Sequence, residues 1–439
     1  MNNALPEAEI LDLASDGRGV ARVDGKALFI DGALPGERVR YRLLKRRRQL
    51  DEGLLIEILV RSADRVEPKC AHFGVCGGCS LQHLAAPAQL AAKQAQLLDS
   101  LQRIGQVAPG RLLPPLAGPP WAYRRRARLG VKYVRKKGRV LAGFREREKP
   151  YIADVRSCEV LVGRFRALPE HIAALVETMS IREQLPQVEV AAGDTEAALV
   201  FRVLAEPSTD DLEQLAAFGR QHAVQIFLQR GGIDSVRPLS ADAVPPGPLL
   251  AYAIEASRVR IEFGPMDFVQ VNGEINAAMV GLALDQLRPE AGDRVLDLFC
   301  GVGNFTLPLA RCAAHVTGIE GDAALVERAR GNAESNGIAN VSFAPANLFD
   351  PDGFGAWGRE RYDLVLIDPP RAGARELLGH MSQWRPRRVV YISCHPGSLA
   401  RDAGILVEAH GLRLIAAGVM DMFPHTTHVE SIAVFEAAG

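Results

Sequence analysis

The sequence predicts a multidomain α/β protein with three consecutive parts. These are an N-terminal OB-like β-barrel over residues 1–62, a central mixed α/β domain with a cysteine cluster over 63–263, and a C-terminal α/β domain over 264–439. Three observations support this division: short alternating runs fill the first part, cysteines gather early in the second, and strands alternate with helices in the third. A chain of 439 residues has room for roughly two to four domains of ordinary size.

The overall composition limits the class of protein. Hydrophobic residues make up 48% of the chain, which is ample for packed cores, and the formal net charge is zero. No run of 18 or more apolar residues occurs, and the opening segment MNNALPEAEI lacks the charged-then-apolar pattern of a signal peptide. We therefore expect a soluble, cytoplasmic protein without a membrane partner.

The N-terminal part has the pattern of a small barrel, and two segments of the chain carry a local excess of positive charge. Runs such as GRGVARVDGKALFIDGALPGERVRYRLL and EGLLIEILV are typical of strands in a small antiparallel barrel. Residues 38–48 contain seven basic residues and no acidic one, and residues 121–149 contain twelve basic and two acidic residues. One such run is ordinarily a solvated face, but two in a neutral chain favour a partner with a phosphate backbone.

The central part opens with a cysteine motif. CAHFGVCGGC places Cys70, Cys76 and Cys79 at C-x5-C-x2-C spacing, and Cys158 in DVRSCEV is a possible fourth ligand. In a reducing compartment such a cluster more often binds metal than forms disulfides, and thiolates suit zinc and iron–sulfur clusters equally. A basic hairpin turning at residues 136–138 and helices near 162–180 and 210–222 complete the part.

The C-terminal part alternates strands with helices, which predicts a parallel sheet with right-handed crossovers. VLDLFCGVGNFTLPLA combines a strand, a glycine turn through Gly301 and Gly303, and a helix, so that the backbone can approach a ligand closely. Thr306 stands where a dinucleotide fingerprint has its third glycine, which argues against a pyrophosphate cofactor. Glu320 ends the next strand, where a carboxylate can bind ribose hydroxyls. The expected strands are RVLDLF, HVTGIE, VSFAPAN, DLVLID and RVVYIS.

A further cysteine, Cys394, lies at the mouth of this sheet. In VVYISCHPGS, Cys394 follows a buried strand and precedes Pro and Gly, so it stands at the edge where open α/β sheets place their chemistry. The residue type alone leaves a core thiol, a metal ligand and a nucleophile open.

Six motifs in one order closely resemble the RNA uracil-C5-methyltransferase family. They are the cysteine cluster, FVQVN (268–272), DLFCGVGNF, DPPR, SCHP and HTTHVESI (425–432). The resemblance implies an N-terminal TRAM RNA-binding barrel, a C-terminal Rossmann-like domain that uses S-adenosylmethionine, and a [4Fe-4S] cluster on the four cysteines. Within the family, tRNA enzymes lack both barrel and cysteines, and one rRNA enzyme lacks the barrel. Possession of both implies 23S ribosomal RNA as the partner, with no obligate protein partner.

The resemblance also implies individual roles. Cys394 is the nucleophile that adds to C6 of uracil, and Glu430 is the base that removes the C5 proton. Asp368, held rigid by two following prolines, lies between the cofactor and the base and can accept the uracil N3 proton. Phe268 and Gln270 face the flipped base. The residues implied to hold the cofactor are Gln270, Phe299, Asn304, Glu320, Asn347 and Asp368.

Several alternatives stay open on the sequence. One alternative target is another RNA such as tRNA, or a cytosine; another interpretation is a non-catalytic rRNA-binding assembly factor. Arg371 replaces the aromatic residue that amino-group methyltransferases carry after their Asp-Pro-Pro, which argues against amine methylation. For single residues, the alternatives are that Phe268 is a core residue and that Glu430 only pairs with His425 or His428.

Overall fold

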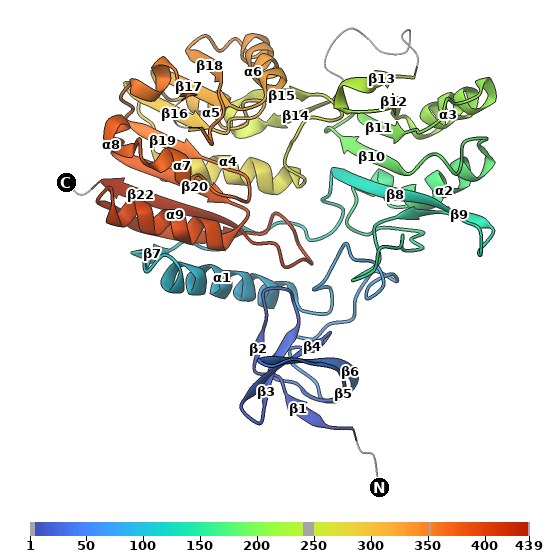
Figure 1. Cartoon of the computed structure of the whole chain (residues 1–439). Coiled ribbons are helices and arrows are strands. Elements are labelled where there is room, and N and C mark those ends of the chain that lie inside the picture. Colours follow the sequence, from blue (N-terminus) through green and yellow to red (C-terminus); the bar gives the residue numbers. More distant parts are fainter. Residues whose placement is uncertain (1–4, 240–249, 351–352, 438–439) are drawn as a thin grey trace.

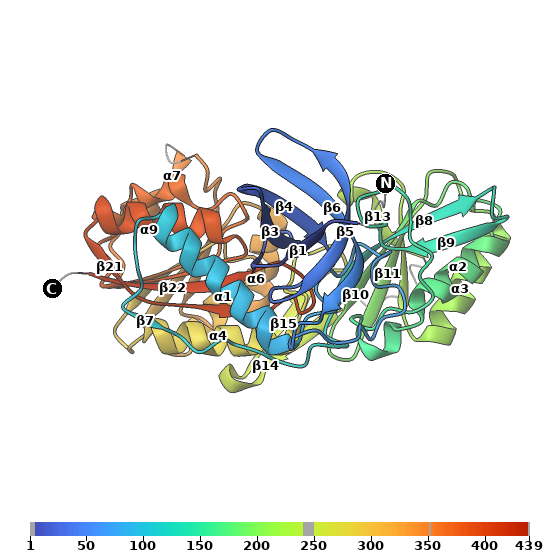
Figure 2. The same ribbon diagram turned by 90° about the horizontal axis from the view of Figure 1, so that it is seen from below.

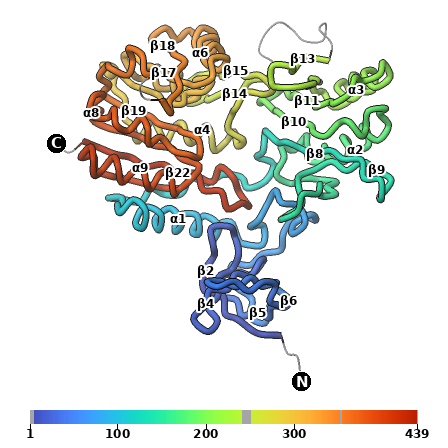
Figure 3. The backbone as a smooth tube through the Cα atoms, viewed as in Figure 1, coloured from blue at the N-terminus to red at the C-terminus, as the bar shows by residue number. Residues whose placement is uncertain are grey.

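The computed structural model describes residues 5–239, 250–350 and 353–437. Figure 1 shows a small barrel below two larger α/β bodies that lie side by side, and Figure 3 follows the chain from the barrel to the C-terminal body. Within the described residues, no helix is long and apolar enough to span a bilayer. The multidomain α/β class predicted from the sequence is confirmed.

The N-terminal body is a six-stranded sheet in the order β1-β5-β6-β4-β3-β2. Its strand pairs are antiparallel except for β4 and β6, which run parallel. In β5, Val39 and Tyr41 are buried while Arg38 and Arg42 are exposed, so the basic run turns its charges outward. The strands are β1 (Glu7–Glu9), β2 (Asp12–Leu13), β3 (Gly19–Val23), β4 (Lys26–Asp31), β5 (Arg38–Arg46) and β6 (Leu50–Val60).

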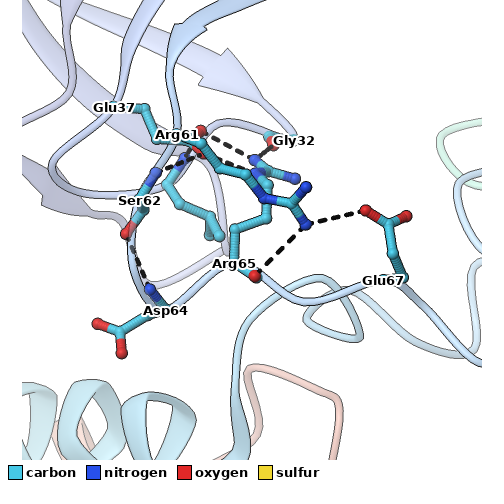
Figure 4. Close-up of polar contacts among 8 residues, drawn as sticks. Gly32, Glu37, Arg61, Ser62, Asp64, Arg65 and Glu67 are labelled. Atoms are coloured by element: carbon cyan, nitrogen blue, oxygen red, sulfur yellow. Dashed lines mark hydrogen bonds and ion pairs between the residues drawn. The ribbon is translucent and has the colours of Figure 1, made fainter.

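A buried ion pair fastens this sheet to the segment that follows it (Figure 4). The side chain of Glu37 is fully buried and accepts hydrogen bonds from Arg65 Nη2 and from the Leu34 amide, both at 2.9 Å. Arg65 also donates to the Gly32 carbonyl at 2.6 Å. Burial alone would raise the pKa of the Glu37 carboxyl, but these hydrogen bonds hold the pKa below its usual value.

The central body is a mixed sheet in the order β13-β12-β11-β10-β8-β9, with α2 and α3 packed against it (Figure 1). The hairpin turn at residues 136–138 and both expected helices are confirmed. The elements are β8 (Arg126–Val134), β9 (Arg139–Gly143), α2 (Leu168–Thr178), β10 (Gln187–Ala192), β11 (Ala197–Arg202), α3 (Thr209–His222), β12 (Gln225–Gln229) and β13 (Val236–Pro238).

The C-terminal sheet has the order β18-β17-β16-β19-β20-β22-β21-β7. The first five strands are parallel, and they are the five strands expected from the sequence. Strand order reverses at β16, where open α/β sheets form a ligand crevice. The strands are β7 (Arg111–Leu112), β16 (Arg294–Leu298), β17 (His315–Glu320), β18 (Val341–Pro345), β19 (Leu364–Ile367), β20 (Arg388–Ser393), β21 (Leu412–Met420) and β22 (Glu430–Ala437).

Each face of this sheet is covered. A hairpin of β14 (Leu250–Ile254) and β15 (Val259–Phe263) shares one core with α4 (Gly273–Leu287), α5 (Thr306–Ala310) and α6 (Ala323–Ser335). The helices on the other face are α1 (Ala86–Arg103), α7 (Arg375–Leu378), α8 (Met381–Trp384) and α9 (Pro396–Glu408).

The packing differs from a linear division at residue 263. Helix α1, strand β7 and the β14–β15 hairpin come from the range 63–263 but pack on the C-terminal sheet. Figure 3 shows α1 beside α9, far from it in sequence. Such long-range contacts leave no local sequence pattern, and the boundary at residue 62 stays a prediction.

Candidate active site

The predicted site residues converge on one edge of the C-terminal sheet, because the carboxyl ends of parallel strands meet there. Strand β22 runs antiparallel to β20, with Ser393 paired to Ser431. The next positions on these strands are Cys394 and Glu430, which therefore stand opposite one another. The other residues at or just beyond the carboxyl ends of the parallel strands are Phe299, Glu320, Asn347 and Asp368.

The glycine turn after β16 is held from the neighbouring strand. Gly301 and Gly303 have φ values of 55° and 93°, a region that favours glycine. The Glu320 carboxylate accepts hydrogen bonds from the amides of Gly301 at 3.0 Å, Gly321 at 2.7 Å and Asp322 at 3.1 Å. A carboxylate has about four acceptor positions, so Glu320 keeps capacity for a ligand hydroxyl.

A buried acid behind this turn was not singled out from the sequence. Asp297 of β16 is fully buried, and its Oδ2 accepts a hydrogen bond from the Thr306 hydroxyl at 2.5 Å. Its Oδ1 has no hydrogen-bond partner among the described residues. Burial raises the pKa of Asp297 to about 7, with further contributions from Asp368 and Glu320. The signal was present in the sequence, as an acid inside the apolar run VLDLF.

Asn304 is largely engaged by other protein groups. Its Oδ1 accepts hydrogen bonds from the Tyr252 hydroxyl at 2.8 Å and from Asn276 Nδ2 at 3.0 Å, and its Nδ2 donates to Asn276 Oδ1 at 2.9 Å. One of the two amide hydrogens remains for a ligand. This network could not be predicted from the residues around Asn304, because Tyr252 and Asn276 come from β14 and α4, which are distant in sequence.

Two aromatic rings lie beyond the carboxyl ends of β16 and β18. Phe299, in the left-handed region at φ 64°, lies with its ring centroid 5.9 Å from that of Phe349. Asn347 accepts a hydrogen bond from the Phe349 amide at 3.1 Å, which fixes the turn after β18. Phe349 was not anticipated from the sequence, and its exposed ring widens the apolar wall beside Phe299.

The groups around Cys394 form one electrostatic cluster. Burial raises the pKa of the Cys394 thiol to about 11; the negative charges of Glu430 and Asp368 add to this, and Arg371 opposes it. Burial also raises the pKa of Asp368 to about 7, and burial with repulsion from Asp368 raises the pKa of Glu430 well above its usual value. The uncomplexed site therefore favours a protonated thiol.

The helix that follows the cysteine offsets part of this effect. His395 is the N-cap of α9, and its ring accepts a hydrogen bond from the Ser398 amide. Cys394 directly precedes this cap, and helix N-termini stabilise thiolates. Within the described residues Glu430 forms no ion pair with His425 or His428, so the structure does not support that alternative.

The two residues expected to face the target base lie on the loop between β15 and α4. Phe268 is 70% exposed, which contradicts the core alternative. Arg126 holds the loop by donating a hydrogen bond to the Asp267 carbonyl. Gln270 is partly buried. Across the described residues, no hydrogen bond or ring contact joins Phe268 or Gln270 to Cys394, so their roles stay predictions.

Comparison with known proteins identifies the family. A family model described as tRNA (Uracil-5-)-methyltransferase matches residues 119–347 and 358–437, and a TRAM domain matches residues 5–53. The 23S rRNA (uracil(1939)-C(5))-methyltransferase RlmD of Methylococcus capsulatus is 50% identical over 98% of this chain and 96% of its own length. The protein of the same name from Alkalilimnicola ehrlichii is 51% identical with the same coverage. The chain belongs to the RNA (uracil-C5)-methyltransferase family.

The fold agrees with this family over the whole chain. The tRNA (uracil-54, C5)-methyltransferase of Pyrococcus abyssi, solved with S-adenosyl-L-homocysteine, superposes with a TM-score of 0.73 at 23% identity. The match covers 98% of this chain and all of the other. The resemblance stated from the sequence is thereby confirmed at the level of family and fold.

The four cysteines expected to bind metal line one cavity, although they come from distant segments. Cys70, Cys76, Cys79 and Cys158 surround a space of about 390 Å³. Burial raises the pKa of Cys76 to about 11 and that of Cys79 to about 12, and the neighbouring thiols add to both shifts. In the part of the chain that the structure describes, no three such side chains lie close enough to hold a single ion.

The basic segment over residues 121–149 is only partly exposed to solvent. Arg125 pairs with Asp194 at 2.7 Å, and Arg126 is engaged with the Asp267 carbonyl. Arg124 lines the cysteine cavity. These three arginines contact the loops around the site. Their tertiary contacts override the expectation of an exposed basic face, which rested on the local density of positive charge. The exposed basic residues of the segment are Arg128, Lys132, Arg135, Lys136, Lys137, Arg139, Arg145 and Lys149.

Proposed function

We propose that this protein transfers a methyl group from S-adenosylmethionine to C5 of a uridine in 23S ribosomal RNA, corresponding to the uracil(1939) of its relatives' names. The observation that carries the proposal is the opposition of Cys394 and Glu430 at the sheet edge, beside the glycine turn and Glu320. These groups supply a nucleophile, a base and a cofactor cradle in one place.

The chemistry needs both groups in succession. Bound S-adenosylmethionine supplies an electrophilic methyl group on a sulfonium. Cys394 first releases its thiol proton to water and then adds as a thiolate to C6 of uracil; electron density moves to C5, which would attack the methyl carbon and release the thioether. Glu430 in its ionised form accepts the proton from C5, the C5–C6 double bond re-forms, and the thiolate of Cys394 leaves.

Asp368 and the flanking residues position the substrate. A protonated Asp368 can donate a hydrogen bond to a uracil carbonyl, and an ionised one can accept the N3 proton. The pKa of Asp368, raised by burial to about 7, allows either state near neutral pH. We propose that Phe268, whose exposure supports the role, stacks on a base extruded from RNA structure. Gln270, Phe299, Asn304 and Asn347 would complete the cofactor and base contacts.

We also propose that Cys70, Cys76, Cys79 and Cys158 hold a [4Fe-4S] cluster. The support is that the side chains of all four cysteines line one cavity, although they come from distant segments. Four thiolates are a ligand set for such a cluster, and zinc, which also binds four thiolates, is the alternative that metal analysis decides.

The cluster proposal is tested by metal analysis. Anaerobically purified protein should be brown and contain iron and sulfide in about equal amounts, near four of each per chain. A Cys79→Ser variant should lose iron and destabilise the segment around the cavity. Zinc in place of iron, or a Cys79→Ser variant with full iron content, would overturn the assignment.

The function is tested by identifying the methylated nucleoside. Purified protein is incubated with labelled S-adenosylmethionine and separated tRNA and rRNA from cells that lack this gene. Label in 5-methyluridine of 23S rRNA is the expected result. Label confined to tRNA or to a cytosine would replace the proposed substrate, and binding without any transfer would indicate an assembly factor.

A further inference from the structure

The loop over residues 421–429 leads directly into Glu430, the proposed base. It joins β21 to β22, and the pairing of Met420 with Glu430 closes it. Glu430 is therefore placed by the strand that it begins and by the loop that precedes it. Besides its own local hydrogen bonds, this loop is bound by residues from distant parts of the chain.

Two buried polar side chains of α1 bind the loop. Lys93 is 3% exposed, and its Nζ contacts Asp421 Oδ1 at 2.7 Å and donates to the Phe423 carbonyl at 3.0 Å. Gln89 is 1% exposed, and its Oε1 accepts a hydrogen bond from the His425 amide at 2.9 Å. One side chain thus fixes the start of the loop and the other its middle.

The same helix also binds the cysteine segment. Gln89 Nε2 donates to the carbonyls of Leu81 at 3.0 Å and Leu84 at 2.7 Å. The amides of Ser80 and Leu81 in turn donate to the His425 carbonyl, both at 2.9 Å. His425 has a φ of 66°, a conformation that a non-glycine residue keeps only when its surroundings enforce it.

Helix α1 also packs against the helix that follows Cys394, the proposed nucleophile. It packs against α9, the helix that begins just after Cys394, and Figure 2 shows the two helices next to each other on one face of the sheet. Leu97 and Leu101 of α1 lie in one core with Leu399 and Ala403 of α9. One rigid element therefore contacts both the helix behind the nucleophile and the loop before the base.

We propose that Lys93 and Gln89 are positioning residues for Glu430, holding it at the separation from Cys394 that proton removal requires. The inference rests on the proposed function. Addition of the thiolate and methyl transfer depend on Cys394 and the cofactor, so loosening the loop affects mainly the last step. A misplacement of about 1 Å can cost about 10²-fold in rate.

The test separates methyl transfer from product release. The variants are Gln89→Leu and the double variant Lys93→Met/Asp421→Leu, which removes both buried charges together and avoids leaving one unpaired. Each should lower kcat about 10²-fold with little change in the KM for S-adenosylmethionine, and should accumulate methylated, covalent protein–RNA complex in a single turnover.

The control is Ile172→Ala, which opens a cavity at a fully buried position of α2 in the core of the central body, away from α1, α9 and the loop. It should lose stability but show the wild-type ratio of covalent complex to free product. If the Gln89 and Lys93 variants show that same ratio, the inference is overturned. If wild-type protein itself forms no 5-methyluridine and no covalent complex, the proposed function fails instead.

Discussion

Cys394 and Glu430 face each other one position beyond the last paired residues of two antiparallel strands, Ser393 of β20 and Ser431 of β22. The Ser431 hydroxyl also donates to the Ser393 carbonyl at 3.1 Å. Strand register thus sets the separation between Cys394 and Glu430, the proposed nucleophile and base. A slip of β22 by one residue against β20 would turn the Glu430 side chain to the opposite face of the sheet, so these strands must pair in one register only.

Replacing Glu320 with Gln should weaken cofactor binding. The amide can keep its oxygen toward the Gly321 and Asp322 amides only by turning its NH₂ toward the Gly301 amide, a donor against a donor. Hydrogen bonds to charged groups contribute about 1.5–3 kcal/mol, so the Kd for S-adenosylhomocysteine should rise about 10- to 100-fold. Calorimetric titration measures it. The control is Glu334→Gln on the exposed face of α6, which should leave the Kd unchanged; equal values for both variants would contradict the assignment.

Removing the partner of Glu37 should destabilise the N-terminal sheet in a pH-dependent way. Arg65→Met leaves a buried carboxylate uncompensated, at a cost of about 3–5 kcal/mol near pH 7. In the wild type the pKa of Glu37 lies below its usual value of 4.5, so the stability it contributes is present above that value and is lost as pH falls through the folded-state pKa. In the variant, burial favours the protonated acid, so acidification restores stability. The difference between the two proteins should therefore shrink from pH 7 to pH 4.

Hydrogen exchange of amides in β3 and β6 measures this opening free energy locally, which suits a chain of several domains. The control is Arg61→Met, since Arg61 pairs with the exposed Glu67 and touches Arg65 through a long hydrogen bond of 3.5 Å to its carbonyl (Figure 4), which leaves the Arg65 side chain on Glu37. A constant difference between Arg65→Met and wild type across this pH range would argue against the linkage.

Neutralising exposed charge on the central hairpin should weaken RNA binding. Lys132→Ala/Lys136→Ala removes two exposed cations of the basic segment. Each lost phosphate contact should lower the slope of log K against log salt by about 0.7–0.9, with no change in cofactor affinity. The control is Arg385→Ala/Arg413→Ala, which removes two exposed cations, one just after α8 and one in β21; Figure 2 shows β21 at the opposite end of the molecule from the β8–β9 hairpin. An unchanged slope in the hairpin variant would show that this run is only a solvated face.

The parallel sheet and its edge residues were predictable because their signals are local. Apolar runs with turn residues define the strands, and the topology of parallel strands then brings Glu320, Asp368 and Cys394 together. The strands of the N-terminal barrel were likewise predicted from short alternating runs bounded by glycine and proline.

The connections between distant segments were not predictable from local patterns. Helix α1 is amphipathic, but nothing in residues 86–103 indicates that Gln89 and Lys93 contact residues 421–425. The basic run over Arg124–Arg126 shows the opposite case. Its density of positive charge suggested an exposed surface, but Arg125 pairs with Asp194 and Arg126 binds the Asp267 carbonyl, both from other elements. In both cases the deciding partner is remote in sequence.

The account's central claim is that Cys394 and Glu430 act in succession on one substrate. Glu430→Gln keeps the shape of the base but removes its proton affinity, and loss of a general base costs about 10²- to 10⁴-fold in rate. The most direct measurement is denaturing electrophoresis of each variant after incubation with substrate RNA and S-adenosylmethionine labelled in its methyl group. Glu430→Gln should give a labelled band that contains protein and RNA, and Cys394→Ala should give none. A slow Glu430→Gln enzyme without such a band, alongside wild type that 5-fluorouridine RNA traps, would assign the proton to another base and contradict the claim.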